Sequence, residues 1–247
     1  MPGSRVGDEP LAVRIDLTDA VDRGWAWIAR PGTWLTSHQK VAIVAETRSA
    51  QTCRLCRDRK VALSPYTVAG AHDCGGELTD AFVEVVHRVR TDSGRVTHAW
   101  YERMLGEGVS DGEYVEIIGV VATAIALDTF NRALGQRFAP LPTPQAGTPS
   151  HYRPAGARHQ LAWVPTLEPD DITAGDPDIY ARYHPPYNIQ KALSLVPEAM
   201  LAFFDLDEVF YLQEQEILDF DNEYRAITHD QMELVAARLS ALNRCYY

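Results

Sequence analysis

The stretch THDQMELVAARLSALNRC, residues 228–245, decides the fold class. It opens with a capping box, in which the Thr228 hydroxyl accepts the third helical amide and the Gln231 side chain reaches back to the cap. Apolar residues then recur at spacings of three and four from Met232 to Leu242. The pattern predicts an amphipathic helix of about four turns that runs to Cys245. No helix-ending Gly or Pro follows, so we expect an interrupted protein.

A second stretch, TSHQKVAIVAETRSAQTC at residues 36–53, repeats this pattern at an offset of 192 residues. Both copies begin with a Thr-x-x-Gln box and continue as an apolar stripe. At this offset Ala45 corresponds to Ala237, and Cys53 corresponds to Cys245. We interpret the two copies as an internal duplication rather than as two unrelated amphipathic helices.

The first copy continues further than the second. After Cys53 and Cys56 comes an inserted segment, at about residues 57–95, and then a short helix at 98–105. A long helix follows from the capping box at Ser110 to Leu134, with Gly135 as its C-terminal cap. We therefore predict an all-α, duplicated helical core with a truncated second repeat. The expected units are residues 1–137, a Pro/Gly-rich connector at 138–188, and residues 189–247.

The length, charge and composition of the chain limit the classes of function that are possible. The chain has 247 residues, a net charge of −11 and 46% hydrophobic residues, which fits a globular protein. The acidic balance argues against nucleic acid and anionic membranes as partners. No run is apolar enough for a signal peptide or a membrane span, so a cytoplasmic location is expected. Four cysteines in a chain this long do not make a disulfide scaffold.

The spacing of Glu233 and Cys245 resembles the active-site motif of the alkylhydroperoxidase D-like, or carboxymuconolactone decarboxylase-like, superfamily. In that motif a glutamate precedes a Cys-x-x-Cys and a histidine follows it. The resemblance is to the branch described as alkylhydroperoxidase-related proteins and selenoproteins. Further stretches that resemble this branch are residues 127–135, 151–154, 192–197 and 224–228.

The resemblance implies a peroxidase-like thiol or selenol oxidoreductase. Its substrate would be an organic hydroperoxide and its partner a dithiol reductant, with no cofactor, in a homo-oligomer. Cys245 would be the resolving thiol and Glu233 part of a proton relay. The reactive cysteine or selenocysteine would follow Tyr247, so this 247-residue chain would be weak or inactive. Decarboxylase or lactone chemistry, as in other superfamily members, stays open.

The complete Cys53-Arg-Leu-Cys56 motif is the second candidate site. It departs from the family pattern, because Val41 stands where the glutamate belongs and Lys60 where the histidine belongs. Without a relay we expect a degenerate site. Three interpretations remain open: a structural or vestigial pair, a redox-active pair, and a metal site with His72 and Cys74 as further ligands. A non-catalytic helical protein with this pair as a structural or zinc element is the alternative function.

Other polar residues give weaker signals. Asp128 and Asn131 lie within the long helix and either line a pocket or join helices. His87, His98 and His151 are expected at the surface or at the edge of the core.

Overall fold

The computed structural model describes residues 12–183, 185–243 and 245. These residues form an all-α fold with no strand among them, as the helical periodicity predicted. The longer helices are α1 (Ile15–Ala29), α2 (Ser37–Ser49), α3 (Arg54–Val61), α4 (Asp80–Asp92), α5 (His98–Gly106), α6 (Asp111–Ala133), α8 (Pro197–Phe210) and α10 (His229–Asn243). The short ones are α7 (Asn188–Lys191), α9 (Glu214–Ile217) and the 3-10 turns η1 (Pro65–Thr67), η2 (Ser93–Arg95) and η3 (Pro169–Asp171).

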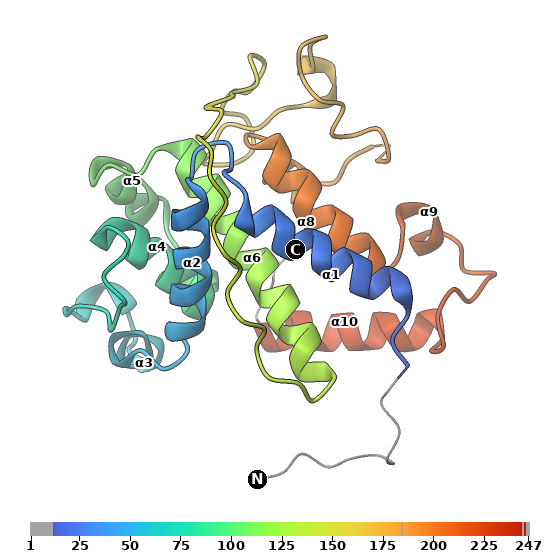
Figure 1. Cartoon of the computed structure of the whole chain (residues 1–247), viewed down its shortest axis with the longest axis horizontal. Helices are drawn as coiled ribbons and strands as arrows, with labels where there is room; N and C mark the ends of the chain where they lie inside the picture. The colour runs from blue at the N-terminus through green and yellow to red at the C-terminus, as the bar shows by residue number, and fades with distance from the viewer. Residues whose placement is uncertain (1–11, 184, 244, 246–247) are drawn as a thin grey trace.

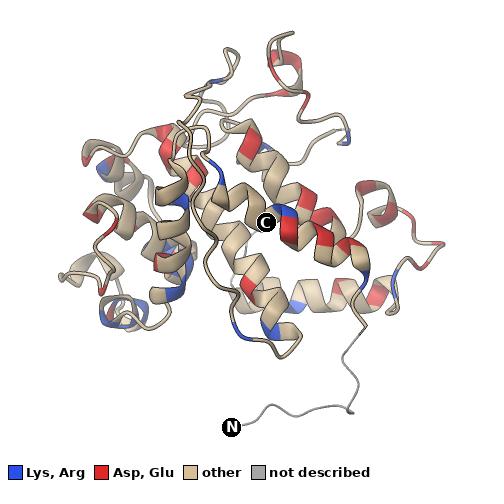
Figure 2. Ribbon diagram, viewed as in Figure 1, with Lys and Arg blue, Asp and Glu red and all other residues tan. Residues whose placement is uncertain are grey.

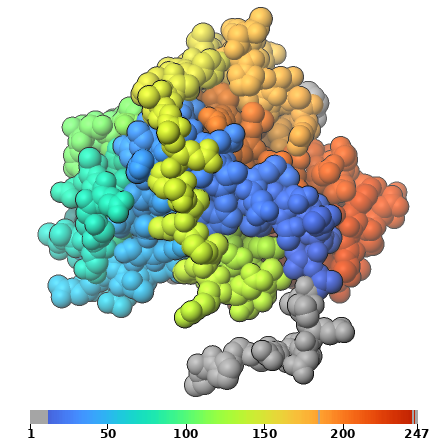
Figure 3. All heavy atoms as spheres, in the orientation of Figure 1, coloured from blue at the N-terminus to red at the C-terminus, as the bar shows by residue number. Residues whose placement is uncertain are grey.

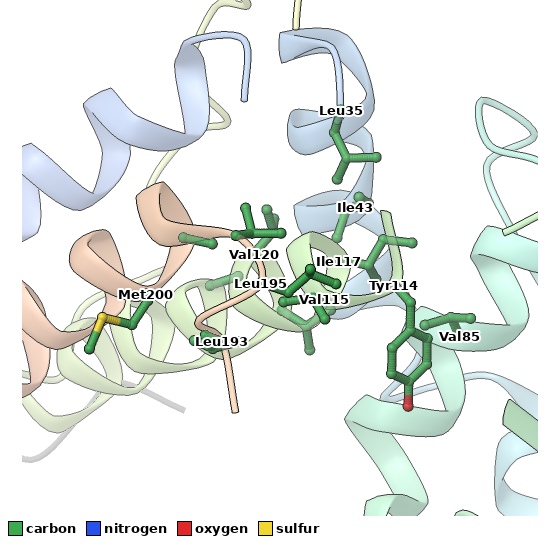
Figure 4. Packing of buried hydrophobic residues seen from close by; sticks show 14 of the residues in the cluster. Leu35, Ile43, Val85, Tyr114, Val115, Ile117, Val120, Leu193, Leu195 and Met200 are labelled. Atoms are coloured by element: carbon green, nitrogen blue, oxygen red, sulfur yellow. The ribbon is translucent and has the colours of Figure 1, made fainter. Parts of the chain in front are cut away.

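Helix α6 is the centre of the fold (Figure 1). It packs against α1, α2, α4 and α8, and α1 also lies along α8. Val120 of α6 is fully buried, as are Ile43 of α2 and Val85 of α4 (Figure 4). Gly119 lets α8 approach closely, because a Cβ there would lie 3.0 Å from the Cβ of Ala199. The core therefore unites helices from both ends of the described chain.

The predicted helix starts are confirmed. Thr36 with Gln39 and Ser110 with Glu113 each form both hydrogen bonds of a capping box. Thr228 and Gln231 make the same reciprocal contacts at the start of α10. Such local signals depend only on residues three apart, which is why the sequence shows them directly.

Helices α2 and α10, which begin with the same Thr-x-x-Gln box, differ in their surroundings. In α2 most side chains are buried against α1, α4 and α6. In α10 only His229 and Met232 are buried among the residues described. Its predicted apolar stripe is largely exposed, with Leu239 54% and Leu242 60% accessible. The apolar face of α10 is therefore open to solvent in the part of the chain that the structure describes.

The connector after α6 is ordered by hydrogen bonds rather than by helices. It returns across the face formed by α1 and α2, as the yellow segment in Figure 3 shows. The Gln145 amide donates to the carbonyl of Ala29, and the Ser37 hydroxyl donates to the carbonyl of Gln145. Further along, Arg158 and Thr166 form an isolated antiparallel bridge.

None of the described helices is both long enough and apolar enough to cross a membrane. Acidic residues are frequent along α1 and α8, whereas α3 is rich in basic residues (Figure 2). The basic character of α3 matters because the intact cysteine motif lies at its start.

Candidate functional site

Cys53 and Cys56 lie at the N-terminal end of α3, where Cys53 is the N-cap residue. Cys53 is 0% and Cys56 5% exposed. Together with Leu55 and Val68 they form a small apolar cluster separate from the main core. Both cysteines are therefore buried at the start of α3.

Two histidines meet these sulfur atoms. His72 comes from the loop before α4, and its Nδ1 lies 3.5 Å from the sulfur of Cys53 and 3.5 Å from that of Cys56. His87 comes from α4, and its Nδ1 lies 3.3 Å from the Cys56 sulfur. The two imidazole rings are 4.3 Å apart between centroids. All four donor atoms lie within 4.8 Å of one another.

A carboxylate stands behind each imidazole. The Nε2 of His72 lies 2.8 Å from Glu84 of α4, and the Nε2 of His87 lies 3.0 Å from Glu46 of α2. Glu46 also accepts the backbone amide of Gly75, which fixes the loop that carries His72. The site thus contains two thiol–imidazole–carboxylate chains, one through each histidine.

Glu84 is held by three donors. It accepts hydrogen bonds from Arg59 of α3 at 2.7 Å, from the indole of Trp100 at 2.9 Å and from His72. Burial alone would raise the pKa of Glu84, but these bonds outweigh it and lower the pKa to about 2. Glu84 is therefore a carboxylate at neutral pH and joins α3, α4, α5 and the His72 loop.

The two histidines respond differently to their surroundings. Burial alone would lower the pKa of His72, but its bonds to Cys56, Glu84 and Cys53 raise it to about 10. Burial dominates at His87 and lowers its pKa, despite its bond to Glu46. The pKa of Cys53 is lowered, because hydrogen bonds from the backbone of Cys56 and Asp73 and from His72 outweigh the effect of burial.

Neither His87 nor Glu46 was predicted from the sequence to belong to the site. His87 was expected at the surface or the edge of the core, and this was wrong: it is 0% exposed. Val41 lies in the core, but Glu46, five residues later on the same helix, supplies a carboxylate. Lys60 lies away from the thiols and binds the Thr91 carbonyl and Asp92. The available signal for His87 was its position three residues after Glu84, among the apolar residues of α4.

Cys74, the fourth ligand considered from sequence, is exposed and does not belong to the group of four donor atoms. Its place is taken by His87. Asp128 forms a paired ion bridge with Arg48 of α2 and so joins two helices.

The C-terminal candidates lie apart. Glu233 accepts a hydrogen bond from the Tyr211 hydroxyl and lies 3.6 Å from His229. Cys245 is exposed and follows the end of α10. Ten residues of helix separate Glu233 from Asn243, the last residue of α10, which is a rise of about 15 Å before Cys245 is reached. The helix continues through this span, so the two side chains lie at its opposite ends.

Comparison of the chain with protein-family models, with curated proteins and with solved structures finds no match.

Proposed function

We propose that the chain is a thiol oxidoreductase that uses Cys53 and Cys56 as its redox pair and reduces organic hydroperoxides. The observation that carries the proposal is the pair of thiol–imidazole–carboxylate chains at this motif. Two thiols in a Cys-x-x-Cys motif can supply the two electrons that reduce a hydroperoxide, because they form a disulfide when they are oxidised. The imidazoles are placed to accept and return the protons that such a reaction moves.

The reaction balances with these groups. A cysteine thiolate attacks the terminal oxygen of the hydroperoxide, the O–O bond breaks, and the alcohol leaves with a proton from an imidazole. The resulting sulfenic acid is attacked by the second cysteine, which forms a disulfide and releases water. An external dithiol then returns two electrons. Cys53 is the better first nucleophile, because it stands at the N-cap position of α3 and hydrogen bonds lower the pKa of its thiol.

Access to the sulfur atoms is limited by the segment at residues 62–79, which carries His72. Cys53 and Cys56 are buried, and the cluster beneath this segment is small. A hydroperoxide can reach them only when the segment opens. The proposal therefore predicts that a small organic hydroperoxide reacts faster than a bulky one.

A role for Glu233 and Cys245 is supported by the sequence resemblance alone. Cys245 and Glu233 would serve a second site of the same kind, with Cys245 as the resolving thiol. Because they lie towards opposite ends of α10, we assign the activity of this chain to the Cys53–Cys56 pair.

The test is hydroperoxide consumption by reduced, metal-free protein with dithiothreitol as the electron donor. Cys53→Ser and Cys56→Ser should each abolish turnover, whereas Cys74→Ser and Cys245→Ser should retain it. Mass spectrometry after one peroxide equivalent should show a Cys53–Cys56 disulfide. Turnover that persists in Cys53→Ser, or no turnover in the parent chain, would overturn the proposal.

A further inference from the structure

The four donor atoms at the start of α3 match the dimensions of a tetrahedral metal centre. Bonds of about 2.3 Å from zinc to sulfur and about 2.05 Å to nitrogen, at tetrahedral angles, place sulfur and nitrogen about 3.6 Å apart. Of the four sulfur–nitrogen pairs, Cys53–His72, Cys56–His72 and Cys56–His87 are 3.5, 3.5 and 3.3 Å apart, and all four donor atoms lie within 4.8 Å of one another. We infer that Cys53, Cys56, His72 and His87 bind one Zn²⁺ ion.

The orientation of the histidines supports this inference. Both imidazoles present Nδ1 to the sulfur atoms and direct Nε2 to a carboxylate. In metal sites a ligating histidine commonly bonds a carboxylate through its second nitrogen, which fixes the ring and its tautomer. Here Glu84 serves His72 and Glu46 serves His87, each from a helix of the core.

The charge of the donor set also suits the ion. Two thiolates and two neutral imidazoles would neutralise Zn²⁺, and no charge would then be left unpaired among the four ligand side chains. Of the two carboxylates behind them, Glu84 is already paired with Arg59 at 2.7 Å. Soft sulfur together with imidazole nitrogen favours zinc over Mg²⁺ or Ca²⁺, which prefer oxygen.

The surroundings show what the ion would hold in place. The cluster of Cys53, Leu55, Cys56 and Val68 is small and separate from the main core. Nearby, Val61 and Leu63 are almost fully exposed. Apolar packing therefore contributes little here, and a bound ion would cross-link α3 and the His72 segment to α4.

This inference concerns the same residues as the proposed redox pair, and it adds a mode of regulation. Four protein ligands leave no open position on the ion, as in structural zinc sites. While zinc is bound, the two thiolates cannot form a disulfide and the segment that covers them stays closed. Zinc would thus keep the dithiol reduced and unreactive.

The first experiment measures metal in the full chain. We expect one zinc per chain after purification from zinc-supplemented cells. Cobalt substitution should give the visible absorption of a tetrahedral ion and thiolate-to-cobalt charge transfer. Cys56→Ser and His87→Ala should weaken zinc binding roughly 100-fold or more in competition with a chromophoric chelator. Cys74→Ser and His98→Ala are the matched controls and should bind as the parent does.

A second variant guards against loss of binding through misfolding. His72→Cys keeps four ligands and should still bind cobalt, with stronger thiolate charge transfer because a third sulfur is present. Zinc affinity that is unchanged in Cys56→Ser, or less than half an equivalent of zinc in the parent protein at micromolar free zinc, would overturn the inference.

The two proposals fail separately. Stoichiometric zinc binding, with no peroxide turnover in either the zinc-loaded or the metal-free protein, would support the metal site and refute the proposed oxidoreductase activity. Peroxide turnover in a protein that binds no zinc would support the oxidoreductase activity and refute the zinc site. If both hold, adding zinc to the metal-free enzyme should inhibit turnover in proportion to occupancy, and a chelator should restore it.

Discussion

Lys40 of α2 provides a quantitative test of the core. Its side chain is 0% exposed. The Nζ donates to the Trp27 carbonyl at 2.6 Å and lies 3.7 Å from the centroid of the Trp27 ring. The charges of Glu116 and Glu198 favour the ammonium form, but the Glu116 carboxylate is occupied by the backbone amides of Thr33, Trp34 and Leu35. Burial therefore lowers the pKa of Lys40 from 10.5 to about 8.

The sign of the effect follows from this pKa. Between about pH 8 and 10.5 the unfolded chain binds more protons at Lys40 than the folded chain does, so the free energy of unfolding rises with pH. The difference of about 2.5 pH units, at about 1.4 kcal/mol each, gives a rise of about 3 kcal/mol. Below pH 8 both states are protonated, and the cost of the buried charge is present in full.

The variant Lys40→Met removes the titrating group with little change in side-chain volume. Urea unfolding of both proteins at several pH values from 7 to 10.5 gives the difference in free energy of unfolding. Cysteines and tyrosines titrate in both proteins, so their contributions cancel. The stability of the parent should rise relative to Lys40→Met by about 3 kcal/mol over this range. A difference that stays constant within about 0.5 kcal/mol would refute the argument.

Three further substitutions test particular contacts. Glu46→Gln should weaken zinc binding about 10- to 100-fold through its effect on His87, as a chelator competition would show. Arg48→Ala leaves Asp128 without its ion partner at a largely buried position, and should cost about 3 kcal/mol in urea unfolding; the double variant with Asp128→Asn should recover part of that loss. Gly112→Ala places a Cβ 2.4 Å from the indole of Trp34, so the melting temperature should fall by the equivalent of about 1–3 kcal/mol.

Helix starts could be predicted from the sequence because each depends on neighbours within one turn. The boxes at Thr36, Ser110 and Thr228 are all present. The all-α class followed from the same periodicity. The burial of each helix could not be predicted this way, since it depends on which helices lie beside it. Thus α2 and α10 share a cap and a stripe, yet one is in the core and the other is exposed.

The site was predictable only in part. The Cys53–Cys56 motif and His72 were recognised because a local spacing marked them. His87 lies 31 residues from Cys56 on a helix that the sequence placed inside an insertion, and only the packing of α4 against α2 and α3 brings it close. Glu46 was hidden for a related reason: the family pattern directed attention to Val41, although the carboxylate that the site uses stands nearer to the cysteines.

Zinc binding and disulfide formation compete for Cys53 and Cys56, and this sets a relation between the two proposals. Zinc binds only the reduced form, so it stabilises that form by an amount that grows with the ratio of free zinc to its dissociation constant. Each tenfold increase in this ratio adds about 1.4 kcal/mol, which makes the pair harder to oxidise by about 30 mV. A measured reduction potential should therefore become more positive with free zinc at this slope. A potential that does not change with zinc would show that the metal and the redox pair do not share these sulfur atoms.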